Sequence, residues 1–178
     1  MCNNARQIAN GLQGIDMLKE KKQVTEQEAW QKLSNWCAKA EHSSGEMRQK
    51  MMRWDIAEDA QERILERLVS GKYIDDERFA HAYAHDKLTY DKWGRRKIEQ
   101  GLFQKGVSKD IYGKVLDEIS DERYIEVLKP LLSKKWKTIT GRNDYECAMK
   151  LMKYALGRGF ELPVIRKCID DMEIPTDD

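Results

Sequence analysis

One spacing of apolar residues occurs three times in this chain, and it limits the possible folds more than any other feature. Each copy places an apolar residue four positions after the first and another five positions after that. The second copy starts 51 residues after the first, and the third starts 53 residues after the second. The copies are Met47-Met51-Ile56, Ile98-Leu102-Val107 and Leu151-Ala155-Phe160. Residues four apart share one face of an α-helix, so the pattern predicts the same helix and turn in three successive units.

A second repeated element precedes each copy and reads as the start of a helix. It consists of an apolar residue, an N-cap residue and acidic or amide residues. Its three forms are Val24-Thr25-Glu26-Gln27, Ile74-Asp75-Asp76-Glu77 and Ile119-Ser120-Asp121-Glu122. Thr, Asp and Ser accept hydrogen bonds from free N–H groups of a first turn, and carboxylates there face the positive end of the helix dipole. Thr25 with Glu28 predicts a capping box, and Ile74 is expected to pack on Phe79.

The remaining pattern predicts a third helix in each unit. These helices are expected over 58–69, 109–119 and 162–172, because their apolar positions coincide at the same offsets. Gly106 and Gly159 follow the second helices, as expected for residues at a helix C-terminus, and Asp55 replaces them in the first unit. In the first helix of unit three, Leu131 and Trp136 are placed on the apolar face, and Pro130 is expected to kink this helix or to mark a local irregularity in it.

The sequence therefore predicts an all-α fold of three tandem three-helix repeats that form an elongated, curved array. We place the repeats at 24–73, 74–118 and 119–174, with a short tail over 175–178. The first 23 residues show weak periodicity, which predicts a flexible arm. No stretch of about 18 apolar residues occurs, so no membrane association is expected. The four scattered cysteines favour reduced thiols in the cytoplasm.

Residue patterns typical of catalysis or metal binding are weak, so we expect no enzyme and no cofactor. His81 and His85 are four apart on one helix, but no third ligand accompanies them, and partly exposed histidines are the simpler interpretation. The sequence has no glycine-rich phosphate loop and no nucleophile elbow. The acidic residues Asp75, Asp76 and Glu77 are already explained by helix capping.

Charge is segregated along the chain although the net charge is only +1. Between Lys87 and Lys105 six basic residues face two acidic ones, and between Lys129 and Arg158 eight face two. Such segments suit polyanions or acidic protein surfaces, although solvated helix faces would look the same. Each segment includes a tryptophan, and we expect Trp136 in the core, while Trp93 is equally consistent with the core and with base stacking. The candidate partner-binding residues are Lys87, Lys92, Trp93, Arg95, Arg96, Lys97, Lys134, Lys135, Lys137 and Arg142.

Several of these motifs, in this order, resemble the RecX regulators of the bacterial recombinase RecA. The segment 73–80 (Tyr-Ile-Asp-Asp-Glu-Arg-Phe-Ala) resembles the best-known motif of that family. Residues 86–107 are similar to its second repeat, residues 41–51 to its first and Arg158-Gly159-Phe160 to its third. The resemblance covers about residues 25–172 and is specific through order and spacing.

The resemblance implies a function that the residues alone do not. Members of the family bind RecA in the helical groove of its filament on single-stranded DNA and suppress its ATPase, strand-exchange and coprotease activities. We therefore expect a monomeric, non-catalytic RecA inhibitor with weak DNA contact at most. The alternative is a helical protein that binds DNA on its own, which would show a steep dependence on salt.

Overall fold

The structure is a computed structural model, and it describes residues 24–171. The described residues form nine α-helices and no strands. The helices are α1 (Glu26–Cys37), α2 (Ser44–Arg53), α3 (Glu58–Ser70), α4 (Asp76–Thr89), α5 (Arg95–Gln104), α6 (Lys109–Asp117), α7 (Asp121–Trp136), α8 (Asp144–Gly157) and α9 (Leu162–Asp170). The predicted arm over residues 1–23 and the predicted tail over 175–178 lie outside the described residues.

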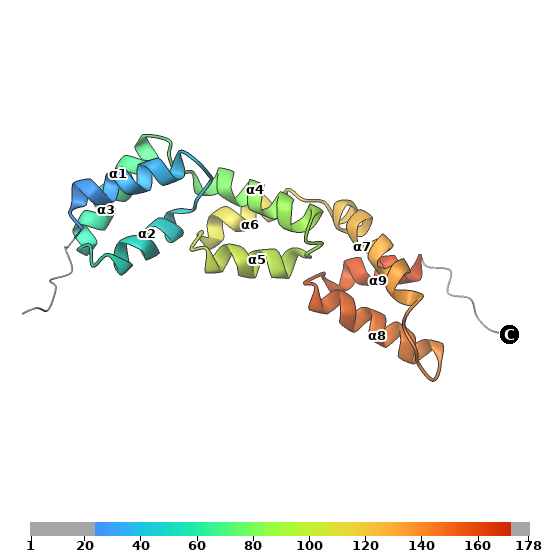
Figure 1. Cartoon of the computed structure of the whole chain (residues 1–178). Helices are drawn as coiled ribbons and strands as arrows, with labels where there is room; N and C mark the ends of the chain where they lie inside the picture. The colour runs from blue at the N-terminus through green and yellow to red at the C-terminus, as the bar shows by residue number, and fades with distance from the viewer. Residues whose placement is uncertain (1–23, 172–178) are drawn as a thin grey trace, which may run out of the picture.

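The nine helices follow one another as three groups of three in an elongated, curved array (Figure 1). Within the groups, α1 packs on α3, α4 on α5 and α6, and α7 on α8 and α9. The second helices α2, α5 and α8 lie along one edge, the lower edge in Figure 1. The predicted all-α repeat fold is thus confirmed.

The second repeated element, which we call the cassette (Val24–Gln27, Ile74–Glu77 and Ile119–Glu122), is a helix start in each unit, as the sequence predicted. Thr25, Asp75 and Ser120 are the N-caps of α1, α4 and α7, and each side chain accepts a hydrogen bond from a first-turn N–H group. The capping box of Thr25 with Glu28 is formed in both directions. The cassette is therefore a structural element in all three units.

The apolar spacing that defines the repeat marks the core. All nine of its residues are buried, from Met47 in α2 to Phe160 after α8. In α7 the helix continues through Pro130, and the buried position is Leu132, whereas Leu131 is half-buried. The sequence pattern thus placed Leu131 on the apolar face but missed Leu132, which is fully buried.

Three equivalent turns join the second and third helices. Asp55, Gly106 and Gly159 all adopt positive φ angles, of 55°, 72° and 87°. Glycine reaches this region without steric cost, and aspartate tolerates it better than most residues. The predicted substitution of Asp55 for glycine is confirmed at this position.

The buried side chains form two separate cores. The first contains the apolar residues of α1 to α3 together with Ile74, and the second runs without interruption through α4 to α9. Ile74 closes the first core whereas Phe79 belongs to the second, so the predicted packing of one on the other is not found. Ile74 marks the boundary between a one-unit body and a two-unit body.

Polar contacts connect the first unit to the second. The buried hydroxyl of Ser43 donates to the carbonyl oxygen of Lys105 at 2.6 Å. The backbone N–H of Ser44 donates to Asp76 at 2.7 Å. Gly45 lies so close to Gly106 that an added Cβ would sit 2.5 Å from its Cα. Ion pairs link Arg78 to Glu41 and Lys105 to Glu46 across the same joint.

The second and third units meet through their backbones. The N–H of Gly94 donates to the carbonyl oxygen of Arg158 at 2.8 Å, and the N–H of Arg96 donates to that of Gly159 at 3.0 Å. A Cβ on Gly94 would lie 2.2 Å from the nitrogen of Phe160. Both joints therefore seat the start of a second helix on the turn of the following unit.

Candidate partner-binding surface

The first predicted basic segment is built around Trp93, which is half-buried against the second core. The ammonium groups of Lys87 and Lys97 lie 4.8 and 4.6 Å from the centre of its ring. Lys87 also pairs with Asp91 at 2.6 Å, and this hydrogen bond raises the pKa of the Lys87 ammonium above its usual value. Trp93 is thus a core residue whose outer face carries two cations.

Arg95 serves the fold. Its guanidinium donates to the carbonyl oxygen of Leu116 at 2.9 Å and pairs with Asp117 at 2.5 Å and with Glu99 at 3.3 Å. Burial opposes the charge, but the hydrogen bond to Asp117 and the nearby carboxylates raise the pKa of Arg95 above its ordinary value. The positive charge of this side chain is therefore neutralised within the fold, at the C-terminal end of α6.

Lys92 and Arg96 differ in how far they are available to a partner. The ammonium of Lys92 donates to the carbonyl oxygen of Thr89 at 2.6 Å, at the end of α4. The side chain of Arg96 is 66% exposed, and its ion pair with Glu161 is long at 3.9 Å. Arg96 is therefore the more accessible of the two cations.

The second predicted basic segment spans the end of α7 and the loop to α8. Lys134 and Lys137 are exposed, and they form no ion pair with any described residue. The side chain of Arg142 is 93% exposed and pairs with Glu146 at 3.2 Å. The backbone N–H of Arg142 and the ammonium of Lys150 lower the pKa of Glu146 to about 2. Trp136 is half-buried against the second core, as predicted.

Arg158, which follows α8 and lies against Tyr154, connects the second basic segment to the first. The ring of Tyr154 lies 5.6 Å from the ammonium of Lys135 and 5.3 Å from the guanidinium of Arg158. Arg158 in turn donates to the carbonyl oxygens of Asp91 and Lys92, at 3.2 and 3.4 Å. Sequence reasoning counted Arg158 as a charge but missed this bridging position, which depends on residues 66 and 67 positions away. Arg142 is not part of this connection.

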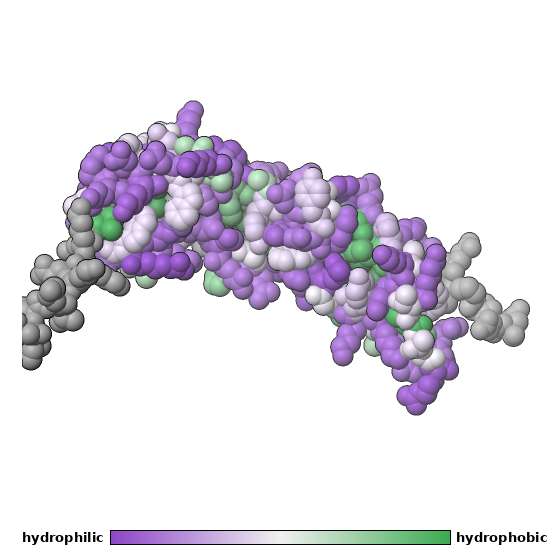
Figure 2. All heavy atoms as spheres, in the orientation of Figure 1, coloured by the Kyte–Doolittle hydropathy of each residue, from purple (hydrophilic) through white to green (hydrophobic). Residues whose placement is uncertain are grey.

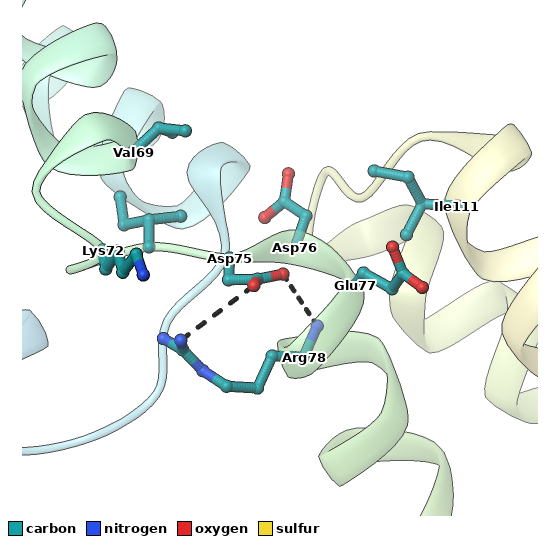
Figure 3. Close-up of a pocket in the computed structure, with 8 residues that line it drawn as sticks. Val69, Lys72, Asp75, Asp76, Glu77, Arg78 and Ile111 are labelled. Carbon is teal, nitrogen blue, oxygen red and sulfur yellow. Dashed lines mark hydrogen bonds and ion pairs between the residues drawn. The ribbon is translucent and has the colours of Figure 1, made fainter.

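An open hollow of about 570 Å³ lies beside the acidic cassette at the joint of the first two units (Figure 3). Asp75 accepts from the N–H of Arg78 at 2.9 Å and lies 4.0 Å from its guanidinium, as the dashed lines in Figure 3 show. Asp76 binds Ser44 of the first unit. Two of the three acidic residues are therefore occupied in capping and in joining units.

The two histidines of α4 line a smaller hollow of about 250 Å³ with Glu118, which lies 3.8 Å from His81. Within residues 24–171, no group of three or more His, Cys, Asp or Glu side chains is arranged to hold a metal ion. None of the described helices is both long and apolar enough to cross a membrane. The surfaces of interest are thus the basic segments and the exposed helix faces.

Comparison with known protein families gives three matches in the order of the units. The first, second and third three-helix domains of RecX match residues 29–68, 75–116 and 121–169.

Several curated relatives carry the name Regulatory protein RecX. The one from Clostridium acetobutylicum is 30% identical over 131 residues, which cover 71% of this chain and 60% of the relative. The one from Halalkalibacterium halodurans is 30% identical over 178 residues, covering 96% of this chain and 66% of the relative. The one from Chlorobium limicola is 31% identical over 128 residues, covering 72% and 79%. The chain thus spans only about 60% of the length of the first of these relatives.

Solved structures share the fold. The crystal structure of RecX from Lactobacillus salivarius has a TM-score of 0.74 at 21% identity and covers 82% of this chain and 95% of its own. A second crystal structure, of regulatory protein RecX, has a TM-score of 0.75 at 22% identity, covering 82% and 73%. At these identities the likeness concerns the arrangement of the helices.

Proposed function

This chain belongs to the RecX family of regulatory proteins, and on that premise we propose that it is a non-catalytic regulator of RecA. It binds RecA and the RecA–single-stranded DNA filament and inhibits the recombinase, ATPase and coprotease activities. It thereby modulates DNA repair in the cytoplasm. The observation that supports this most is the ordered series of three RecX domains between residues 29 and 169.

The shape of the molecule fits this role. An elongated array can contact several protomers of a filament at once, and each added contact is intramolecular once the first has formed. High avidity then needs neither an enclosed pocket nor a catalytic group. Figure 1 shows that the described units form an elongated, curved array of this kind.

Among the candidate residues, we assign electrostatic contact with the filament mainly to those whose charge is not used within the fold. Lys134, Lys137 and Arg96 are the most available, whereas Lys87, Lys92 and Arg95 hold internal partners. Lys97, Lys135 and Arg142 are engaged with a ring or a carboxylate but remain at the surface. A charge reversal at Arg95 is unsuited as a test, because it would remove the contacts of α5 with Leu116 and Asp117 of α6.

The direct test measures the DNA-dependent ATPase of RecA while the chain is added. We expect inhibition at well below one chain per RecA protomer, because one array engages several protomers. Full ATPase activity at stoichiometric concentrations would rule the proposal out.

A paired variant tests the electrostatic part. The double reversal of Lys134→Glu and Lys137→Glu is expected to weaken inhibition about 10-fold, because like charges then oppose the encounter with an acidic partner. The matched control reverses the exposed Lys39 and Lys114, which lie outside both basic segments. Equal inhibition by both double variants would show that this segment does not contact the partner.

The alternative function, autonomous DNA binding, predicts a different salt response. A chain that neutralises several phosphates alone would bind bare single-stranded DNA with an affinity that falls steeply with salt. We expect weak binding to bare DNA and much tighter binding to the RecA filament. Equal affinity for both would favour the alternative.

A further inference from the structure

The three second helices expose a large apolar residue at the same repeat position. This position directly follows the second buried residue of each helix, and it is occupied by Met52, Phe103 and Leu156. Their exposed fractions are 61%, 70% and 40%. Single exposed apolar residues are common, but the same kind of residue at one register of every repeat is not explained by the fold.

Two exposed positions beside it in each second helix share another property: none of them is acidic. One turn earlier stand Gln49, Gln100 and Lys153, and one residue later stand Arg53, Gln104 and Gly157. The chain as a whole carries 31 acidic residues. The nearest carboxylate in α5, Glu99, is tied to Arg95. We call these nine positions the second-helix ridge; they carry apolar, amide or cationic groups.

The ridge follows one edge of the molecule. In Figure 1, α2, α5 and α8 succeed one another along the lower edge, and Figure 2 shows pale green apolar groups among purple ones there. On α8 the apolar surface extends to Tyr145 and Met149, which are 74% and 45% exposed. A hollow of about 380 Å³ lies along it between Met149 and Leu156, bordered by Lys150 and Lys153. One carboxylate, Glu146, also lines this hollow, and it is paired with Arg142 and Lys150.

We propose that the second-helix ridge is the docking surface for a polymer of identical protein subunits, which under the proposed function is the RecA filament. Three equivalent side chains at three equivalent places fit a partner that offers one pocket repeatedly. The absence of carboxylates from these nine positions and the presence of Arg53 and Lys153 fit pockets bordered by acidic groups. Met52, Phe103 and Leu156 each enter the pocket of a successive subunit.

This arrangement makes the contacts cooperative. Each apolar side chain gains free energy when it leaves water, and the rigid array holds the second and third contacts near their pockets after the first has formed. The loss of one contact is therefore modest, whereas the losses from all three multiply.

The test replaces Met52, Phe103 and Leu156 by glutamine, singly and together. Glutamine is a good helix former, so the helices are retained, which the thermal unfolding of each variant verifies. Affinity for the RecA–single-stranded DNA filament is measured by sedimentation of the labelled chain. We expect about 5-fold weaker binding for each single variant and about 100-fold for the triple variant. The controls are Val69→Gln and Tyr90→Gln, whose side chains are 53% and 73% exposed but lie off the ridge; they should bind as the unchanged chain does.

Each outcome decides the proposal. If the unchanged chain binds the filament and the triple variant binds equally well, the ridge is not the docking surface, and the proposed function stands. If the unchanged chain does not bind, both fail. If the triple variant loses the same factor on bare single-stranded DNA, the ridge is a nucleic-acid surface and the proposal is overturned. If the unchanged chain self-associates and the triple variant does not, the occupant is a second copy, which also overturns it.

Discussion

The hydroxyl of Ser43 accepts from the N–H of Glu46 at 3.1 Å and donates to the carbonyl oxygen of Lys105 at 2.6 Å. It is completely buried, so both hydrogen bonds are made out of contact with water. One side chain therefore caps α2 and fastens the first unit to the second. The capping role follows from residue type and local sequence, whereas the acceptor lies 62 residues away and could not be identified from the chain.

Cys37 is a second residue whose environment decides its chemistry. Burial, and then the charges of Glu41 and Glu46, raise the pKa of the Cys37 thiol to about 11. The thiolate is the reactive form, so at pH 8 we expect alkylation of Cys37 about 100-fold slower in the folded chain than in the urea-unfolded chain. Peptide-resolved mass spectrometry after timed iodoacetamide treatment measures both rates. A folded rate within a few-fold of the unfolded one would contradict the burial of this thiol.

At the scale of elements, the two joints between units have the same geometry but use different hydrogen-bonding groups. In each, the N-cap of a second helix sits on the turn before the third helix of the next unit. The first joint uses the side chain of Ser43, and the second uses the backbone N–H of Gly94. A side chain at position 94 would collide with Phe160, so the direct backbone contact requires glycine.

Two glycine substitutions separate this contact from general helix effects. Gly94→Ala is expected to destabilise the protein by about 2–3 kcal/mol, because its Cβ would overlap the backbone of Phe160 and force the units apart. Gly113→Ala meets nothing within 4 Å inside α6 and is expected to stabilise by about 0.5–1 kcal/mol. Urea unfolding followed by circular dichroism gives both values. Equal changes for the two variants would show that the second joint does not need close contact.

At the scale of the whole molecule, the array consists of two bodies. The first unit has its own small core, and the second and third units share one. The joint between the bodies is polar: it combines the hydrogen bonds of Ser43 and Ser44 with partly exposed ion pairs, such as that of Arg78 with Glu41, which salt screens and which contribute little individually. The joint between units two and three adds a shared apolar core. The first unit is thus the more loosely attached part of the surface proposed to follow the filament.

Hydrogen exchange tests this division. We expect the amides of α1 to α3 to exchange through an opening separate from, and lower in free energy than, that of α4 to α9. About 1 M salt should lower protection at Ser44, where the N–H binds Asp76, more than at Gly94. Exchange measured by mass spectrometry against urea concentration resolves the openings. A single opening shared by all nine helices would contradict two bodies.

The candidate surface was only partly accessible from the sequence. Residue type and charge identified the cations, but they did not show which of these cations have partners within the fold. Arg95 and Lys92 look like Lys134 in the sequence, yet they hold carbonyl oxygens of α6 and of the end of α4. The exposed apolar position of the second helices was also missed. Its signal was present, since Met52, Phe103 and Leu156 directly follow the buried position of each repeat.

The sequence alone determined the helices, their starts and the threefold repeat, because caps and apolar spacing act within a few residues of each other. Tertiary structure alone decided which units share a core and how the joints are made. It also decided which cations remain free at the surface. Those properties depend on contacts between residues far apart in the chain, such as Gly94 with Phe160 and Ser43 with Lys105. Sequence patterns that act over a few residues do not specify contacts between such distant residues, which form only when the folded units pack together.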